Sequence, residues 1–145
     1  MFNLSRSRIL AIGKVRKDWI KSGINLYKRR FPNLSIIEIK DSDINKEADA
    51  IRSLIKSNEY TIALCEEGER LTSLDLATKM QKLSSKRLVF LIGGANGLSS
   101  SIKNAADFRL SLSPLTFPHE IARLLLIEQL YRANNIAQGG PYHRH

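Results

Sequence analysis

Short apolar runs alternate along the chain with segments in which apolar residues recur every three or four positions. Apolar runs rich in Ile, Val and Leu are typical of strands, and the three- and four-residue spacing is typical of amphipathic helices. The runs predict strands at residues 8–14, 34–40, 60–65, 87–94 and 108–113. The spacing predicts helices at residues 18–31, 44–55, 72–83, 99–106 and 118–136. Strands separated by helices favour an α/β fold with a mainly parallel sheet of five to six strands.

Three local patterns refine this prediction. The run RLVFLIGG at residues 87–94 is almost wholly apolar, as expected of a central parallel strand buried on both faces. The charged segment EEGER at residues 66–70 predicts a loop after the third strand. Thr72, with Asp75 three residues later, predicts the start of a helix that is capped by the threonine hydroxyl.

The last predicted helix carries more apolar residues than one stripe requires. Its large apolar side chains are Ile121, Leu124, Leu125, Leu126, Ile127, Leu130 and Tyr131. One face of a sheet buries a single stripe of a helix, so the surplus must contact something else. Either a second copy of the chain covers it, or the helix is deeply buried within one copy.

Composition narrows the class of protein. The chain has 145 residues and is 43% hydrophobic, which suits a single globular domain over residues 1–145. No apolar run is long enough to span a membrane, and the N-terminus lacks the features of a signal peptide. The lone cysteine, Cys65, excludes an internal disulfide and suits a reducing compartment. We therefore expect a cytoplasmic protein with no membrane partner.

The charge balance points to a polyanionic partner. The sequence has 23 Lys and Arg against 14 Asp and Glu, a net charge of +9, with a local peak at residues 28–30. A field of this sign favours nucleic acid. The alternative is a protein whose surface is merely basic.

Two loops between a strand and a helix are candidate ligand sites. The segment IGGANGLS at residues 92–99 has glycines at 93, 94 and 97, which fit neither common nucleotide-binding fingerprint. It indicates either a ligand loop or a tight turn. The segment LSLSPLTFPHE at residues 110–120 combines backbone amides, small hydroxyls and apolar side chains. An adenine ring requires that combination, although an ordinary connecting loop has the same composition.

Several chemistries are unsupported. The three histidines, at 119, 143 and 145, have no second cysteine to complete a metal site. No G-x-S-x-G motif supports a serine hydrolase. Cys65, at a strand end, is more typical of core than of a nucleophile.

Other polar residues have plain structural interpretations. Arg132 follows Glu128 by four residues, which is the favourable order for a helical ion pair. His119 near a helix start fits a capping role. The terminal Tyr142, His143 and Arg144 fit a disordered tail as well as a reactive one.

Four segments nevertheless carry a resemblance. The segments ILAIGK, FLIGGANGLS, LSLSPLTFPHEIARLLLIEQLYRA and PYHR resemble, in that order, the SPOUT-superfamily methyltransferases that modify a pseudouridine of bacterial 23S rRNA at ring N3. The similarity spans nearly the whole chain and is most specific in the last third. It implies a C-terminal trefoil knot, a homodimer, and an active site completed at the subunit interface. It also implies S-adenosylmethionine as cofactor and 23S rRNA, within an assembled ribosomal subunit, as substrate.

The resemblance assigns residues by position. It implies cofactor contacts from Leu64, Gly93, Leu112, Ser113, Pro114, Leu115, Thr116 and Phe117. It implies catalytic roles for Arg132, Tyr142, His143 and Arg144, the last three in a catalytic tail at residues 139–145. The family needs no metal. This chain departs from the family pattern in about five extra residues within Met1 to Arg8, in residues 65–68, and in the added His145.

Two other functions compete with this assignment. A non-catalytic RNA-binding module would use the same basic surface but would need no cofactor pocket. A nucleotide-binding α/β enzyme acting on small substrates would not bind RNA in a salt-sensitive way. The PYHR tail argues against the first, and the net charge argues against the second.

Overall fold

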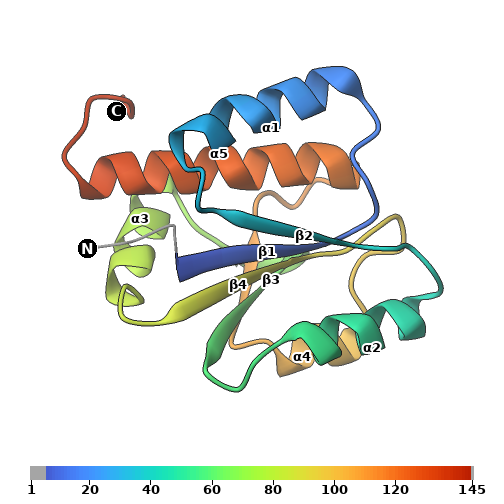
Figure 1. Cartoon of the computed structure of the whole chain (residues 1–145). Coiled ribbons are helices and arrows are strands. Elements are labelled where there is room, and N and C mark those ends of the chain that lie inside the picture. Colours follow the sequence, from blue (N-terminus) through green and yellow to red (C-terminus); the bar gives the residue numbers. More distant parts are fainter. Residues whose placement is uncertain (1–5, 145) are drawn as a thin grey trace.

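The computed structural model describes residues 6–144, in which strands and helices alternate from end to end (Figure 1). The strands are β1 (Ser7–Ile12), β2 (Ser35–Ile39), β3 (Glu59–Arg70), β4 (Arg87–Ile92) and β5 (Phe108–Ser111). The helices are α1 (Asp18–Arg30), α2 (Ile44–Leu54), α3 (Ser73–Lys82), α4 (Ser100–Ala105) and α5 (His119–Ala137). The ten predicted elements are therefore confirmed. His145 and part of the N-terminal extension lie outside the described residues.

The five strands form one sheet in the order β2-β1-β4-β3-β5, and every pairing is parallel. In β4 every residue after Arg87 is buried, which confirms the prediction of a central strand covered on both faces. From β1 the chain adds β2 at one side of the sheet, and after β2 it crosses over to form β3 on the other side. Because the strands are parallel, the carboxyl ends of β4 and β5 lie at the same edge of the sheet, beside residues 64–67 in the irregular part of β3.

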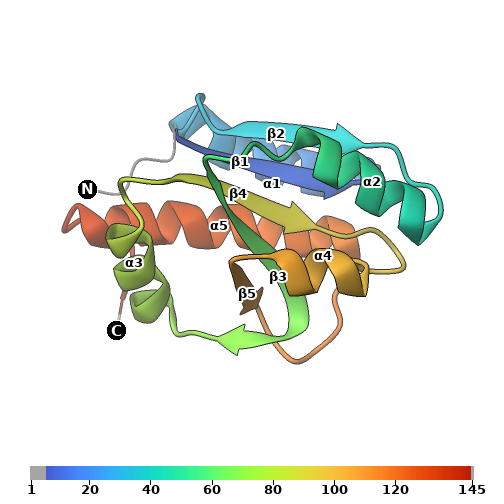
Figure 2. The same cartoon turned by 90° about the horizontal axis from the view of Figure 1, so that it is seen from below.

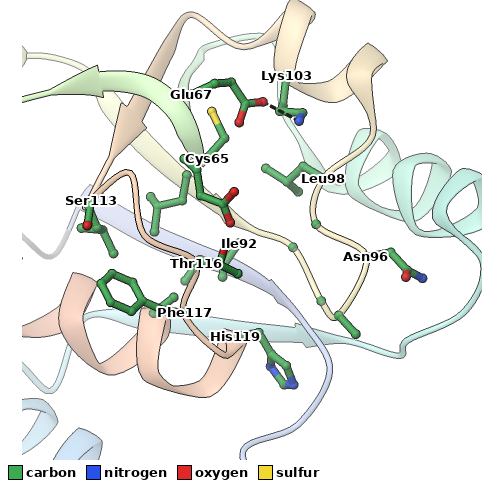
Figure 3. Close-up of a pocket in the computed structure, with 18 of the residues that line it drawn as sticks. Cys65, Glu67, Ile92, Asn96, Leu98, Lys103, Ser113, Thr116, Phe117 and His119 are labelled. Carbon is green, nitrogen blue, oxygen red and sulfur yellow. Dashed lines mark hydrogen bonds and ion pairs between the residues drawn. The ribbon is translucent and has the colours of Figure 1, made fainter.

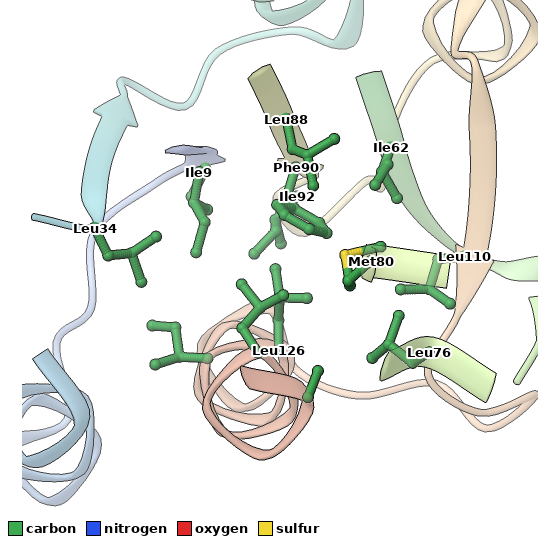
Figure 4. Packing of buried hydrophobic residues seen from close by; sticks show 14 of the residues in the cluster. Ile9, Leu34, Ile62, Leu76, Met80, Leu88, Phe90, Ile92, Leu110 and Leu126 are labelled. Atoms are coloured by element: carbon green, nitrogen blue, oxygen red, sulfur yellow. The ribbon is translucent and has the colours of Figure 1, made fainter. Parts of the chain in front are cut away.

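Helices cover both faces of the sheet and enclose two apolar cores (Figure 2). On one face α1, α3 and α5 cover a cluster that includes Phe90, Leu126 and Met80 (Figure 4). On the other face α2 and α4 cover a second cluster, which includes Leu91 and Ile102. Burial of these large side chains is the main source of stability, at roughly 25 cal/mol per Å² of apolar surface.

The start of α3 confirms the predicted cap. The Thr72 hydroxyl accepts a hydrogen bond from the Asp75 amide at 3.0 Å. Near the start of α5, a carboxylate accepts hydrogen bonds from backbone amides of a segment distant in sequence. Glu120 accepts hydrogen bonds from the amides of Lys17 and Arg16, which lower its pKa below the ordinary value of 4.5. This contact ties the first turn of α5 to the segment that precedes α1.

The predicted loop at residues 66–70 is wrong. These residues extend β3 to Arg70, and they pair with β5 after an irregularity that places both Leu64 and Glu69 opposite Leu110. Charged residues disfavour a central strand, but near the edge of a sheet their side chains can face water. The ladder to β5 therefore outweighs the local sequence preference.

Helix α5 is covered largely within the chain. It lies beside α1 (Figure 1), and Leu126, Ile127 and Leu130 are fully buried. The remaining apolar side chains of α5 are at most half-exposed, so the chain itself accounts for the surplus noted in the sequence. The strongly exposed large apolar residues lie elsewhere among the described residues: Trp19, Leu26, Leu74 and Leu115.

Within residues 6–144, no helix has the length and apolar character that a membrane crossing requires.

Candidate functional site

A cavity of about 420 Å³ opens at the carboxyl ends of β4 and β5, beside the irregular middle part of β3 (Figure 3). Ligands of α/β proteins commonly bind at this edge of the sheet, and this volume suits a small organic molecule. Three segments supply most of the wall: residues 64–67, residues 92–98 and residues 112–117 without Pro114. Lys103, His119 and Ala122 complete it.

The second of these segments is shaped by a close backbone approach. Gly94 and Gly97 form an isolated bridge, and the Gly97 amide donates to the Gly94 carbonyl at 3.0 Å. A Cβ atom on Gly93 would lie 2.4 Å from the carbonyl carbon of Gly97, closer than packing allows. Only glycine therefore fits at position 93, and the segment forms a tight turn that lines the cavity.

The third segment forms an irregular loop between β5 and α5. Its backbone belongs to no helix or strand, so its amides and carbonyls are not used in a regular ladder. Leu112 and Phe117 are half-buried and supply apolar walls, whereas Leu115 is 68% exposed. Pro114 is exposed and does not line the cavity. Apolar walls beside backbone groups that lie outside a regular ladder are what an adenine ring requires.

Charged groups stand at one side of the cavity. Lys103 donates to Glu67 at 2.5 Å, and this hydrogen bond lowers the pKa of the Glu67 carboxyl (Figure 3). Burial, followed by the nearby Glu67 charge, raises the pKa of the Cys65 thiol. The thiol therefore stays protonated at neutral pH, which argues against a nucleophilic role. The sequence interpretation of Cys65 as a core residue is wrong, because the side chain is only partly buried and lines the cavity.

A second cluster lies at the other end of α5, where the chain turns back along the helix (Figure 1). Gly139, with a φ of 71°, follows the last turn of the helix. The amide of Tyr142 donates to the Asn135 side chain at 2.9 Å, and the Tyr142 hydroxyl donates to Glu128 at 2.8 Å. The described part of the tail is therefore docked on its own helix.

Arg132 joins the tail to the helix. Its guanidinium pairs with Glu128 at 2.7 Å, which confirms the predicted ion pair and raises the pKa of Arg132. The same guanidinium lies 3.0 Å from Nδ1 of His143 and 4.7 Å from the centre of the Tyr142 ring. Three of the four residues with expected catalytic roles therefore meet, while Arg144 is exposed.

The ring of Tyr142 sits in an aromatic group. It meets Tyr131 edge-on, with 4.6 Å between the ring centres, and its hydroxyl lies 3.5 Å from that of Tyr27. The Tyr27 hydroxyl, burial and Glu128 together raise the pKa of Tyr142 above its ordinary value of 10.0. Tyr142 is therefore a neutral phenol at any physiological pH and does not act as a base.

The cavity and the tail cluster lie apart in one chain. His119, which lines the cavity, and Arg132 are separated along α5 by about 20 Å at 1.5 Å per residue. Seven of the eight positions with expected cofactor contacts line the cavity, but none of the four expected catalytic residues does.

Sequence patterns alone missed the roles of Glu128, Asn135 and His119. Glu128 and Asn135 hold the tail, and polar residues two turns apart on a helix, followed by glycines, were the available signal. His119 makes no capping hydrogen bond and lines the cavity instead. Among residues 6–144, no three His, Cys, Asp or Glu side chains gather as metal ligands would.

Comparisons with known proteins agree with this geometry. The ribosomal RNA large subunit methyltransferase H of Prochlorococcus marinus (strain MIT 9211) is 65% identical over 144 residues, 99% of each chain. The protein of the same name from Parasynechococcus marenigrum (strain WH8102) is 57% identical over 142 residues, 98% of this chain and 99% of that one.

Two solved structures share the fold at low identity. A probable methylase family protein from Haemophilus influenzae Rd KW20 has a TM-score of 0.60 at 13% identity, covering 99% of this chain and 72% of that one. The SpoU methyltransferase AviRb from Streptomyces viridochromogenes, solved with AdoMet, has a TM-score of 0.50 at 15% identity, covering 92% and 58%. A family model described as "Predicted SPOUT methyltransferase" matches residues 6–143. The chain therefore belongs to the SPOUT methyltransferase family.

Proposed function

We propose that this protein methylates ring N3 of a pseudouridine in 23S rRNA, with S-adenosylmethionine as the methyl donor. One observation carries the proposal: a chain 65% identical, over its full length, to a ribosomal RNA large subunit methyltransferase has a cavity at the positions expected to hold the cofactor. The basic charge of +9 suits an RNA substrate.

The cavity has the chemistry that the cofactor needs. The apolar side chains of Leu64, Leu112 and Phe117 would enclose the adenine ring, and the irregular backbone at residues 112–117 would bind its edge. Close packing at Gly93 leaves no room for a side chain there and fixes the loop beside the ligand. Threading of the C-terminal segment through these loops, as a trefoil knot, belongs to the same proposal.

The active site is completed by a second copy of the chain. Arg132 lies about 15 Å along α5 from Ala122, the last residue of the helix that lines the cavity, and Tyr142 is docked beside Arg132. Both are too far away to act on a ligand within the cavity of their own chain. In a homodimer with two-fold symmetry each tail would approach the cavity of the other subunit, so that two equivalent sites form. The separation of the two clusters supports this arrangement, whereas the apolar surface of α5 does not require it.

S-adenosylmethionine supplies an activated methyl group on a sulfonium centre, so no metal is needed. The protein has to orient the base and allow N3 to lose its proton. His143 is the proposed proton acceptor, because neutral imidazole is the strongest side-chain base near neutral pH. Arg132 and Arg144 would stabilise negative charge on the carbonyl groups that flank N3. Tyr142, held as a neutral phenol, would stack on the base.

The imidazole assignment has a direct test. Replacement of His143 by Ala should lower turnover and alter the pH dependence of the rate, because the variant lacks the proposed proton acceptor. Normal turnover at every pH would show that water, beside the two arginines, accepts the proton.

Substrate recognition requires a surface larger than one nucleotide. The shallow groove lined by Lys28, Arg29 and neighbouring polar residues of α1 would contact phosphates of an assembled ribosomal subunit. Binding should weaken steeply with salt as counterions compete for these contacts.

The experiment that tests the function is incubation of the purified protein with tritiated S-adenosylmethionine and ribosomal particles, followed by mapping of the labelled nucleotide. Label at N3 of one 23S pseudouridine supports the proposal. Binding of RNA without cofactor affinity would favour a non-catalytic module. Cofactor binding without salt-sensitive RNA binding would favour an enzyme for small substrates.

A further inference from the structure

The cavity has one polar side that the proposed function leaves unused. Most of its wall is made of apolar side chains and backbone, but Lys103 and Glu67 form an ion pair on it, with 2.5 Å between Nζ and Oε1 (Figure 3). The two residues come from different elements, Glu67 from the irregular part of β3 and Lys103 from α4. Two opposite charges are therefore held side by side at the edge of a ligand site.

The pair has capacity for further partners. The Lys103 side chain is 24% exposed and the Glu67 side chain 53%. A lysine ammonium has three donors, of which Glu67 accepts one, and a carboxylate has more acceptor positions than one lysine fills. An ion pair so exposed contributes little to stability, so the fold does not need it. The Lys103 hydrogen bond lowers the pKa of Glu67, which keeps the carboxylate charged at neutral pH.

We propose that Lys103 and Glu67 recognise the amino-acid end of the ligand, with Lys103 binding its α-carboxylate and Glu67 its α-ammonium group. The inference rests on the proposed function, in which S-adenosylmethionine occupies the cavity. The amino-acid end carries these two opposite charges on one carbon atom, and a side-by-side ion pair is their complement. The two side-chain charges and the two ligand charges then alternate in sign, so that each charge lies next to two charges of the opposite sign.

The pair acts on one part of the ligand only. Adenine and ribose would be held by residues 92–98 and 112–117, which lie on other walls of the cavity. Loss of the pair should therefore weaken ligands that have an amino-acid end and leave shorter ligands unaffected.

Calorimetric titration with two neutral thioethers separates these effects. S-adenosylhomocysteine has the amino-acid end, and 5′-methylthioadenosine has a methyl group in its place. We expect Lys103→Met and Glu67→Gln each to weaken S-adenosylhomocysteine binding by about tenfold, the equivalent of one charge-assisted contact, with 5′-methylthioadenosine unchanged. Lys82→Met is the matched control, since Lys82 is exposed on α3 and does not line the cavity. Its affinities for both ligands should equal those of the wild type.

Other outcomes overturn the inference. Equal weakening of both thioethers by Lys103→Met would mean that the pair only maintains the shape of the cavity. Unchanged affinity for both would mean that the pair does not contact the ligand. If the wild type bound neither thioether nor S-adenosylmethionine, the proposed function would fail as well, which the wild-type titrations reveal on their own. Thermal unfolding of each variant shows whether the fold is intact.

Discussion

The cavity at the start of α5 and the tail cluster at its end are formed by different kinds of chemical group. At the start of the helix, the cavity wall consists mainly of loop backbone, glycines and apolar side chains, with the ion pair of Lys103 and Glu67 on one side. At its end, the tail cluster consists of charged and aromatic side chains joined by specific hydrogen bonds, with Glu128 as the shared acceptor. The shape of the cavity depends mainly on the path of the backbone, whereas the structure of the tail cluster depends on the identity of individual side chains. Ligand binding and catalysis should therefore fail separately when either end is altered.

The largest effect should come from the tail. Deletion of residues 141–145 removes Tyr142, His143 and Arg144, and methyl transfer should fall by at least about a hundredfold, the usual contribution of an acid–base group. Calorimetry should show unchanged cofactor affinity, because these residues do not line the cavity. Loss of both properties would show that the tail supports the fold and not only the reaction.

A single added methyl group should disturb the cavity at the start of α5. In Gly93→Ala the new Cβ would lie 2.4 Å from the carbonyl carbon of Gly97, so the bridge between Gly94 and Gly97 must open. We expect cofactor affinity to fall by about tenfold or more and stability by about 1–3 kcal/mol, a typical cost of overpacking. Titration and thermal unfolding measure the two. Unchanged affinity would remove Gly93 from the ligand site.

A mixture of Gly93→Ala and the tail deletion tests whether the two ends of α5 act across subunits, when the cofactor concentration in the assay is too low for Gly93→Ala to bind it. Gly93→Ala retains an intact tail, and the chain lacking residues 141–145 retains an intact cavity. If they are unfolded and refolded together in equal amounts, half of the dimers are mixed and one of the two sites in each is intact. About a quarter of the wild-type activity should return. Activity that stays at the level of the separate variants would place both ends of the site in one subunit.

The smallest effect should come from the acceptor shared by the tail and the helix. Glu128→Gln keeps the shape of the side chain but removes the charge that pairs with Arg132 and accepts from Tyr142. We expect turnover to fall severalfold, cofactor affinity to stay unchanged, and stability to fall by at most about 0.5 kcal/mol, as for other i,i+4 pairs. The pKa of Tyr142 should move down toward its ordinary value, which an ultraviolet pH titration detects. If the pKa does not move, Glu128 contributes nothing to the raised pKa, and the Tyr27 hydroxyl and burial account for it.

Much of the fold could be read from local pattern. The apolar run at residues 87–94 specified a strand buried on both faces, and Thr72 specified the start of a helix, because both depend on neighbours close in sequence. The four-residue spacing of Glu128 and Arg132 likewise gave their ion pair. The loop prediction at residues 66–70 failed because pairing with β5 is a contact with a segment about 40 residues away, which local propensity does not register.

The sequence by itself determined the order and type of the elements, the basic charge and, through its motifs, the positions expected to bind a cofactor. Only the tertiary structure decided that residues 64–67, 92–98 and 112–117 enclose one cavity, and that Lys103 joins Glu67 on its wall. It alone placed Arg132, which holds the tail, about 15 Å along α5 from Ala122 at the cavity wall. The reason is that periodicity records which face of an element is buried, whereas distances between elements depend on how the sheet is assembled from distant parts of the chain.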